Sequence, residues 1–214
     1  MTTATLPAFD ELDNIRTTIQ TELLGEIAKD RKFDRKRCED IIFELLTMSY
    51  VYGIEVAGLD LEQDIPVDRE KMRQAVMAKT AGENFLERMN GHIDAADQKA
   101  AESDQISANL TTAETLANEL AVLAETEAHR VMNTAVADGA EEYLEQNPSQ
   151  NLTKTWLTRR DDRVRETHDY LEGMTVPYDA RFYTFDGDSA RFPGDFTDAA
   201  NNVGCRCLLR LNEE

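Results

Sequence analysis

The chain has 214 residues, enough for one or two small domains with a hydrophobic core. Its net charge of -19 is uneven: residues 152–214 hold 9 basic and 12 acidic side chains (net -3), and residues 1–151 hold 14 and 30 (net -16). Such a surface repels phosphate backbones, so tight binding to duplex DNA is not expected. Neither a leader peptide nor an uninterrupted apolar run of membrane-spanning length is evident, so we expect synthesis in the cytoplasm and no membrane partner.

Apolar residues recur at helical spacing through residues 9–146, which predicts a helical region. A first helix is expected from about Asp10, a second over 34–57, and a third from Pro66, a favourable first-turn residue. The first carries Leu12, Ile15, Ile19, Leu23 and Ile27; the third carries Met72, Val76, Phe85, Leu86 and Met89. The polar, Ala-rich stretch 92–110 is expected to be mobile or an exposed helix.

One long helix is expected to close this region. Thr111-Thr-Ala-Glu114 has the pattern of a capping box and predicts the start of the helix. Asn147-Pro148 predicts its end at about Gln146, because proline cannot continue a helix. His92 and His129 have no catalytic partner in the pattern and are expected to face solvent.

Residues 152–214 have a different character, with 8 of the 15 aromatic residues and 4 of the 10 glycines. Strands are expected at 152–158, 174–176, 182–185 and 205–211, a short helix over 161–171 ending at Gly173, and turns at 186–188 and 193–195. The aromatic core is expected to contain Trp156, Phe182, Phe185 and Phe192. The fold class is therefore α+β, with an acidic helical region over 1–150 and a small antiparallel α+β module over 151–214.

Six short motifs follow one another over residues 156–207. They are Trp156, Asp162-Arg163-Val164-Arg165-Glu-Thr-His168, Leu171-Glu-Gly173, Phe182, Pro193-Gly194-Asp195 and Asn202-Val-Gly-Cys205-Arg206-Cys207. In order and spacing they resemble the phage head-morphogenesis proteins, the Mu gpF-like and SPP1 gp7-like minor head proteins. An upstream helix of that family bears Ala-Arg-Thr-Glu, and Ala124-Glu125-Thr126-Glu127 occupies the corresponding place, so the resemblance covers residues 110–210.

This resemblance implies a structural protein of a tailed bacteriophage, without enzymatic activity. The protein would be incorporated in few copies into the virion head after assembly in the host cytoplasm. Its partners would be the portal protein, the major capsid protein or both. The acidic helices would supply contacts with the portal or with further copies of the chain.

His168, Cys205 and Cys207 are the candidate metal ligands, because thiolates and imidazole suit Zn²⁺. We expect the three to lie close together, since a unit of about 60 residues brings its segments into contact. The favoured interpretation is adjacency without a metal, with buried thiols and a hydrogen-bonded histidine. The alternative is a structural zinc, with Asp161, Asp162 or Asp195 as a fourth ligand.

Two further alternatives concern chemistry at the module. Arg163 and Arg165 are interpreted as a surface for the portal or DNA, or as part of a structural network in which Arg165 pairs with Asp169 one helical turn away. A metal-dependent hydrolase or nuclease that uses His168, Cys205 and Cys207 is the rival to a structural protein. Familiar enzyme motifs are missing from the sequence, which favours the structural interpretation.

Overall fold

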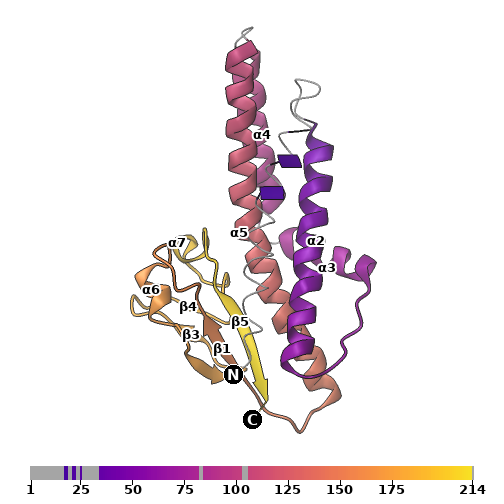
Figure 1. The fold of residues 1–214 in the computed structure, drawn as a ribbon, viewed down its shortest axis with the longest axis vertical. Coiled ribbons are helices and arrows are strands. Elements are labelled where there is room, and N and C mark those ends of the chain that lie inside the picture. Colours follow the sequence, from indigo (N-terminus) through magenta and orange to yellow (C-terminus); the bar gives the residue numbers. More distant parts are fainter. Residues whose placement is uncertain are drawn as a thin grey trace.

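The protein is described by a computed structural model, which covers residues 17–18, 21–22, 25, 34–81, 84–102 and 106–213. Its elements run in the order α2-α3-α4-α5-β1-α6-β2-β3-β4-α7-β5 (Figure 1). The predicted α+β class, with helices followed by a small antiparallel unit, is confirmed. Of the first predicted helix only residues 17–18, 21–22 and 25 are described, and they are helical; its apolar residues Leu12, Ile15, Ile19, Leu23 and Ile27 lie outside the described residues.

Helix α2 (Arg35–Asp60) begins after Asp34, whose carboxylate accepts a hydrogen bond from the Arg37 N–H and so satisfies a free donor of the first turn. The predicted helix over 34–57 is confirmed, with one more turn at its end. By length and composition alone α2 could cross a membrane, yet 61% of its most apolar stretch is buried inside the protein. Its apolar character is accounted for by its place in the core.

Two helices stand where the sequence predicted one from Pro66. These are α3 (Arg69–Ala81) and α4 (Phe85–Ala101), and α4 follows Asn84, which has a left-handed backbone with φ of 53°. Asparagine tolerates this conformation better than most residues, so the helical pattern is interrupted without an apparent break in the apolar spacing. Residues Ile93 and Ala96 of α4 are buried, so this part of the stretch predicted as exposed belongs to the core.

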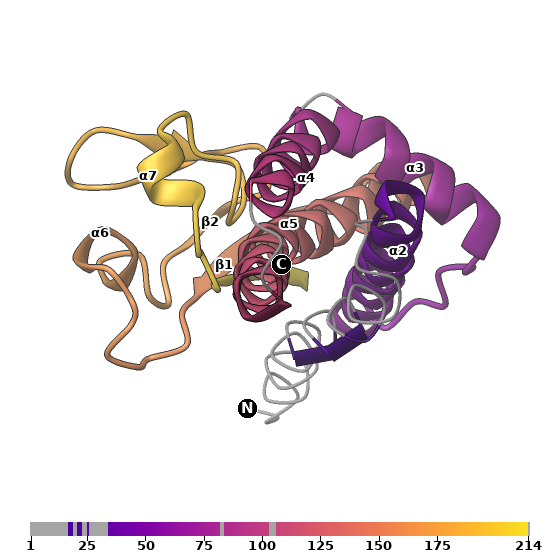
Figure 2. The same ribbon diagram turned by 90° about the horizontal axis from the view of Figure 1, so that it is seen from above.

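Helix α5 (Ile106–Gln146) is the longest element and joins the two parts of the molecule. It starts before the predicted capping box at Thr111 and ends at the predicted Gln146. Viewed from above, α5 lies between α2 and the strands (Figure 2). It therefore contacts the other helices on some faces and the C-terminal module on another.

Small residues let α2 and α5 approach closely. A Cβ atom added to Gly53 would lie 2.7 Å from the Cβ of Ala135 and would collide with the Met132 carbonyl oxygen. One turn further along, a Cβ on Gly139 would lie 2.6 Å from that of Ala57. The crossing thus depends on the absence of two side chains.

The module contains a three-stranded antiparallel sheet in the order β2-β1-β5, formed by β2 (Thr175–Pro177), β1 (Leu152–Leu157) and β5 (Leu208–Glu213). A separate hairpin pairs β3 (Phe182–Tyr183) with β4 (Ser189–Ala190). The predicted strand at 152–158 is confirmed, and its alternating burial directs Leu152, Lys154 and Trp156 inward. The turns expected at 186–188 and 193–195 contain Gly187 and Gly194, both with positive φ.

Polar contacts also tie α2 to the sheet. The carboxylate of Asp60, at the end of α2, accepts hydrogen bonds from the Arg210 guanidinium (2.8 Å from Nε) and from the Leu211 N–H (3.0 Å), both on β5. The buried apolar residues of the helices and of the module form one continuous cluster. The boundary predicted at residue 150 thus separates two kinds of secondary structure that share a core.

Candidate functional site

His168 and the two cysteines of the final motif meet inside the module. His168 lies on the short helix α6 (Glu166–Asp169), and its Nδ1 is 3.6 Å from the Cys205 Sγ and 3.5 Å from the Cys207 Sγ. The three potential ligand atoms lie within 4.8 Å of one another, and all three residues are buried. The structure therefore brings together the three residues that the sequence singled out.

The elements around this cluster differ from those predicted. Cys205 and Cys207 precede β5 in an irregular segment, whereas the sequence predicted a strand from 205 to 211. Only 166–169 of the predicted helix over 161–171 is helical. Gly204 has a φ of 68°, and the turn that it makes after α7 (Ala199–Asn202) turns both thiols toward His168 without requiring a strand.

Aromatic rings fix the orientation of His168. Its imidazole stacks on the Phe196 ring, with centroids 5.2 Å apart, and meets the Trp156 ring edge-on at 5.6 Å. Phe182 packs against Trp156 on another side, at 5.2 Å. The predicted aromatic core is confirmed for Trp156, Phe182 and Phe192, but Phe185 is 61% exposed, and Phe196 takes part in its place.

The two thiols influence each other's ionisation. Hydrogen bonding from Cys207 holds the pKa of the Cys205 thiol well below its usual value, and the His168 imidazole acts in the same direction. The same contact and burial raise the pKa of Cys207. This cluster therefore stabilises a buried thiolate, the form of cysteine that binds metals.

Helix α5 holds the cysteine segment by hydrogen bonds. The Asn133 side chain donates to the Cys207 carbonyl (3.0 Å) and accepts from the Leu209 N–H (2.8 Å). The Thr126 hydroxyl accepts from the Gly204 N–H at 3.2 Å. Thr126 belongs to the stretch 124–127 that carried part of the family resemblance, so this stretch lies against the terminal motif.

Helix α5 also buries several charged and polar side chains. Glu125 and Glu127 are buried, and Glu127 forms an ion pair with Arg130 at 2.5 Å. His129, predicted to face solvent, is 2% exposed. Burial, with the nearby Arg159 and Arg206, lowers the pKa of His129 to about 3, so this imidazole is neutral at physiological pH. His92 is half-buried, with its Nδ1 3.0 Å from a Glu119 carboxylate oxygen.

A second network positions α6 against the final segment. Arg165 donates to the carbonyl oxygens of Asn201 (2.8 Å) and Val203 (2.6 Å), in place of the expected pairing with Asp169. The Asn201 side chain accepts from Thr167 and donates to Asp188. These hydrogen bonds hold the short loops in one conformation, as a longer sheet would otherwise do.

The other motif residues have structural places. Arg206, which lies between the two cysteines in the sequence, forms an ion pair of 2.6 Å with Asp161. The neighbouring Asp162 is exposed and does not take this place. The Arg206 guanidinium, through its hydrogen bond, holds the pKa of Asp161 below its usual value. Gly173 closes a turn with φ of 71°.

The Pro193-Gly194-Asp195 turn packs close to α5. A Cβ on Gly194 would lie 3.0 Å from the Arg130 Cγ, and the φ of 92° also favours glycine. Asp195 accepts hydrogen bonds from the Arg191 N–H and side chain. Both carboxylates are thus engaged by arginine side chains: Asp195 by Arg191, and Asp161 by Arg206.

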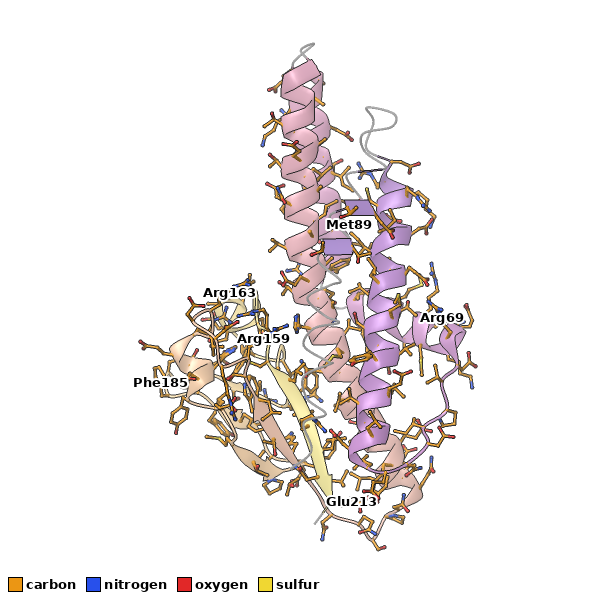
Figure 3. All side chains as sticks on the ribbon, viewed as in Figure 1. Arg69, Met89, Arg159, Arg163, Phe185 and Glu213 are labelled. Atoms are coloured by element: carbon orange, nitrogen blue, oxygen red, sulfur yellow. The ribbon has the colours of Figure 1, made fainter. Side chains whose placement is uncertain are left out.

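A small cavity of about 10 Å³ adjoins the cluster, with Arg159, Arg163, Arg165 and Arg206 among its lining residues. In Figure 3, Arg159 lies on the side of the module nearest the helices, and Arg163 at the end of the module. A space of this size holds about one water molecule and no organic substrate. The buried cluster thus adjoins a small space that arginine side chains line.

A sequence profile of the family described as Phage Mu protein F like protein matches residues 69–210. This span runs from α3 to β5 and includes 142 of the 214 residues, so the chain belongs to this family of phage head-morphogenesis proteins. The resemblance found in the motifs is thereby confirmed.

One similar curated protein is the NAD(+)–arginine ADP-ribosyltransferase EFV of Enterococcus faecalis, which is 39% identical over 85 residues. The matched part is 40% of this chain and 17% of that protein, so the chain spans a small fraction of the length of that relative. No solved structure matches the chain.

Several supporting residues were not found from the sequence. Asn133 lies 74 residues before Cys207, and neither it nor the nearer Asp188 and Phe196 was assigned a supporting role from the sequence. Asn133 offered one signal, since it is an amide among the apolar residues Val131, Ala135 and Val136 of a helix. A polar residue on a buried helical face needs a hydrogen-bond partner, and here the partner is the cysteine segment.

Proposed function

We propose that the protein is a minor head protein of a tailed bacteriophage that binds the portal protein, the major capsid protein or both during head assembly. It would act by association, without bond chemistry, and would be carried in the phage head. The family match supports this most strongly, because it runs continuously from α3 to β5 and so includes helices and module together.

The charge distribution supports a protein partner in preference to DNA. The first 151 residues carry a net charge of -16, and a surface of this charge is repelled by packaged DNA. An acidic helical region can instead face basic surfaces of neighbouring head proteins or lie between copies of the same chain.

Exposed aromatic residues support a direct contact made by the module. Tyr170, Tyr183 and Phe185 are 56%, 61% and 61% exposed, and we name them the outer aromatic surface. The rings of Tyr170 and Phe185 meet edge-on with centroids 6.0 Å apart, and Phe185 lies on the side of the module away from the helices (Figure 3). Aromatic side chains are enriched in the centres of protein interfaces, and we assign this surface to the portal.

Co-expression with the portal and capsid proteins of the same phage tests this proposal. The chain should co-purify with the portal on size-exclusion chromatography. The double variant Tyr170→Ser, Phe185→Ser should lower recovery of the complex about tenfold, as expected when interface anchors are lost. A Met77→Ser variant, which changes a 50% exposed residue on α3, should leave recovery unchanged. Failure of the unaltered chain to bind either head protein would contradict the proposal.

A further inference from the structure

We propose that His168, Cys205 and Cys207 bind a structural zinc ion, with a solvent molecule as the fourth ligand. The proposal concerns the stability of the module and is independent of which head protein the chain binds. It takes up the alternative raised from the sequence, because the geometry of the cluster matches a coordination site in three respects.

The first respect is the distances. A tetrahedral zinc ion with Zn–S of about 2.3 Å and Zn–N of about 2.0–2.1 Å separates nitrogen from sulfur by about 3.5–3.6 Å. The observed separations between His168 Nδ1 and the two sulfurs are 3.6 and 3.5 Å. The nitrogen–sulfur separations therefore already match those of a tetrahedral zinc site.

The second respect is that one nitrogen faces both sulfurs equally. Imidazole Nδ1 has a single in-plane direction in which it donates or accepts a hydrogen bond, so it is suited to one sulfur partner. Two sulfurs at nearly equal distances are better explained by a shared centre. The other ring nitrogen, Nε2, is buried without a hydrogen-bond partner among the described residues, so the polar contacts of this imidazole are those of Nδ1 with the two sulfurs.

The third respect is charge. Two thiolates, a neutral imidazole and Zn²⁺ have a total charge of zero, which lowers the cost of burying the group. The neighbouring Arg206 is already paired with Asp161, and Arg165 with two backbone carbonyls. The cluster thus requires no further counter-charge once the metal is bound.

The fourth ligand is assigned to solvent. Within the described part of the chain, the group contains only these three ligand residues. Asp161 is engaged by Arg206, and Asp195 by Arg191. The adjoining cavity of about 10 Å³ has room for one water molecule. We assign the ion a structural role because it would hold together segments that are distant in the sequence.

Such an ion would join two segments that are 37 residues apart in the sequence. One is the loop and short helix that carry His168, and the other is the segment before β5. The module has only short strands and short helices, and small units of this kind often depend on a metal or disulfide. Zinc binding would therefore contribute directly to the folding of the module.

The test is metal analysis of the full chain purified under reducing conditions without added chelator. We expect about one zinc per chain by mass spectrometry of the elements, as one Cys₂His site implies. Removal of the metal with a strong chelator should lower the melting temperature, and added Zn²⁺ should restore it. Replacement by Co²⁺ should produce the thiolate charge-transfer absorption of a tetrahedral site.

The matched variants are Cys205→Ser and Cys38→Ser. Both cysteines are buried and neither forms a disulfide, but Cys38 lies on α2 outside the cluster. Cys38→Ser should retain the metal, and Cys205→Ser should lose at least nine-tenths of it. If Cys205→Ser does not fold, the chelation and Co²⁺ titration of the unaltered chain still decide the question. The proposal would be overturned if the unaltered chain contains no zinc and gives no thiolate absorption with Co²⁺.

Discussion

The helical region and the module fill their interiors with different chemistry. Between α2 and α5 the contacts are apolar and close, and the crossing requires glycine at positions 53 and 139. Inside the module, aromatic rings surround an imidazole and two thiols, and buried amides and arginines hold the loops. A long helical interface is specified by shape and apolar burial, whereas a small unit with short strands needs specific polar bonds.

The largest expected effect is in the module core. Trp156→Ala removes a fully buried side chain that packs against His168, Phe182 and Phe196, and should lower the free energy of unfolding by about 3–5 kcal/mol. Chemical denaturation followed by far-ultraviolet circular dichroism measures it. The control is Tyr183→Ala, at an exposed position on β3. It should change the free energy of unfolding by less than about 0.5 kcal/mol. Equal effects of the two variants would show that Trp156 is not a core residue.

The next effect tests the helical region. Gly53→Ala places a methyl group against the Met132 carbonyl and the Ala135 side chain, and should destabilise by about 3 kcal/mol. Gly91→Ala is the control, because a Cβ there meets nothing within 4 Å. It should be neutral or stabilising by up to about 1 kcal/mol, since alanine favours helices. Thermal denaturation distinguishes the two, and a tolerated Gly53→Ala would mean that the helices are not in close contact.

A third prediction concerns the boundary between the regions. Asn133→Leu leaves the Cys207 carbonyl and the Leu209 N–H without their partner, and should cost about 2 kcal/mol. Thr134→Val is the control, because the Thr134 hydroxyl only donates to a carbonyl of its own helix, that of Arg130. Emission from Trp156, the only tryptophan in the sequence, reports on the module, and circular dichroism reports on the helices. Unchanged stability would indicate that α5 does not position the cysteine segment.

The smallest effect has the opposite sign. Burial lowers the pKa of Lys154, on the inner face of β1, from 10.5 to about 8. Between these values the unfolded chain binds more protons than the folded protein, so stability should rise with pH from about 8 to 10.5. Lys154→Met should stabilise the protein at pH 7 by about 1 kcal/mol, after loss of the contacts with the Tyr178 and Phe182 rings.

The control for this pH dependence is Lys36→Met, at an exposed position paired with Asp40. It should give no gain at pH 7. A Lys154→Met variant that is less stable than the unaltered protein at pH 7 would show that the buried ammonium group has a favourable partner.

The sequence predicted the elements whose pattern is local. The start of α2, the end of α5 and strand β1 follow from capping, proline and alternation, which act within a few residues, whereas α2 continues one turn past its predicted end. The break before α4 was missed because Asn84 changes the backbone without changing the apolar spacing. Phe185 was assigned to the core because of its residue type, yet it lies beyond β3 and faces outward.

The sequence predicted which residues form the cluster, but not the residues that hold them in place. His168, Cys205 and Cys207 were identified by residue type and motif order, and the structure brings them together. Their surroundings depend on long-range partners: Asn133 is 74 residues from Cys207, and Asp161 is 45 residues from Arg206. Contacts at such separations leave no local spacing signal in a single sequence.

The continuity of α5 has a mechanical consequence. Its first residue, Ile106, lies twenty positions before Thr126, the hydroxyl of which contacts the cysteine segment. At a rise of about 1.5 Å per residue, the helix extends about 30 Å beyond this contact, and Figure 1 shows it projecting past the module. Because this extension is long, a tilt of about 5° at the module would move the far end of the helix by about 3 Å. A head protein that binds the far end of α5 would therefore determine the orientation of the module relative to itself.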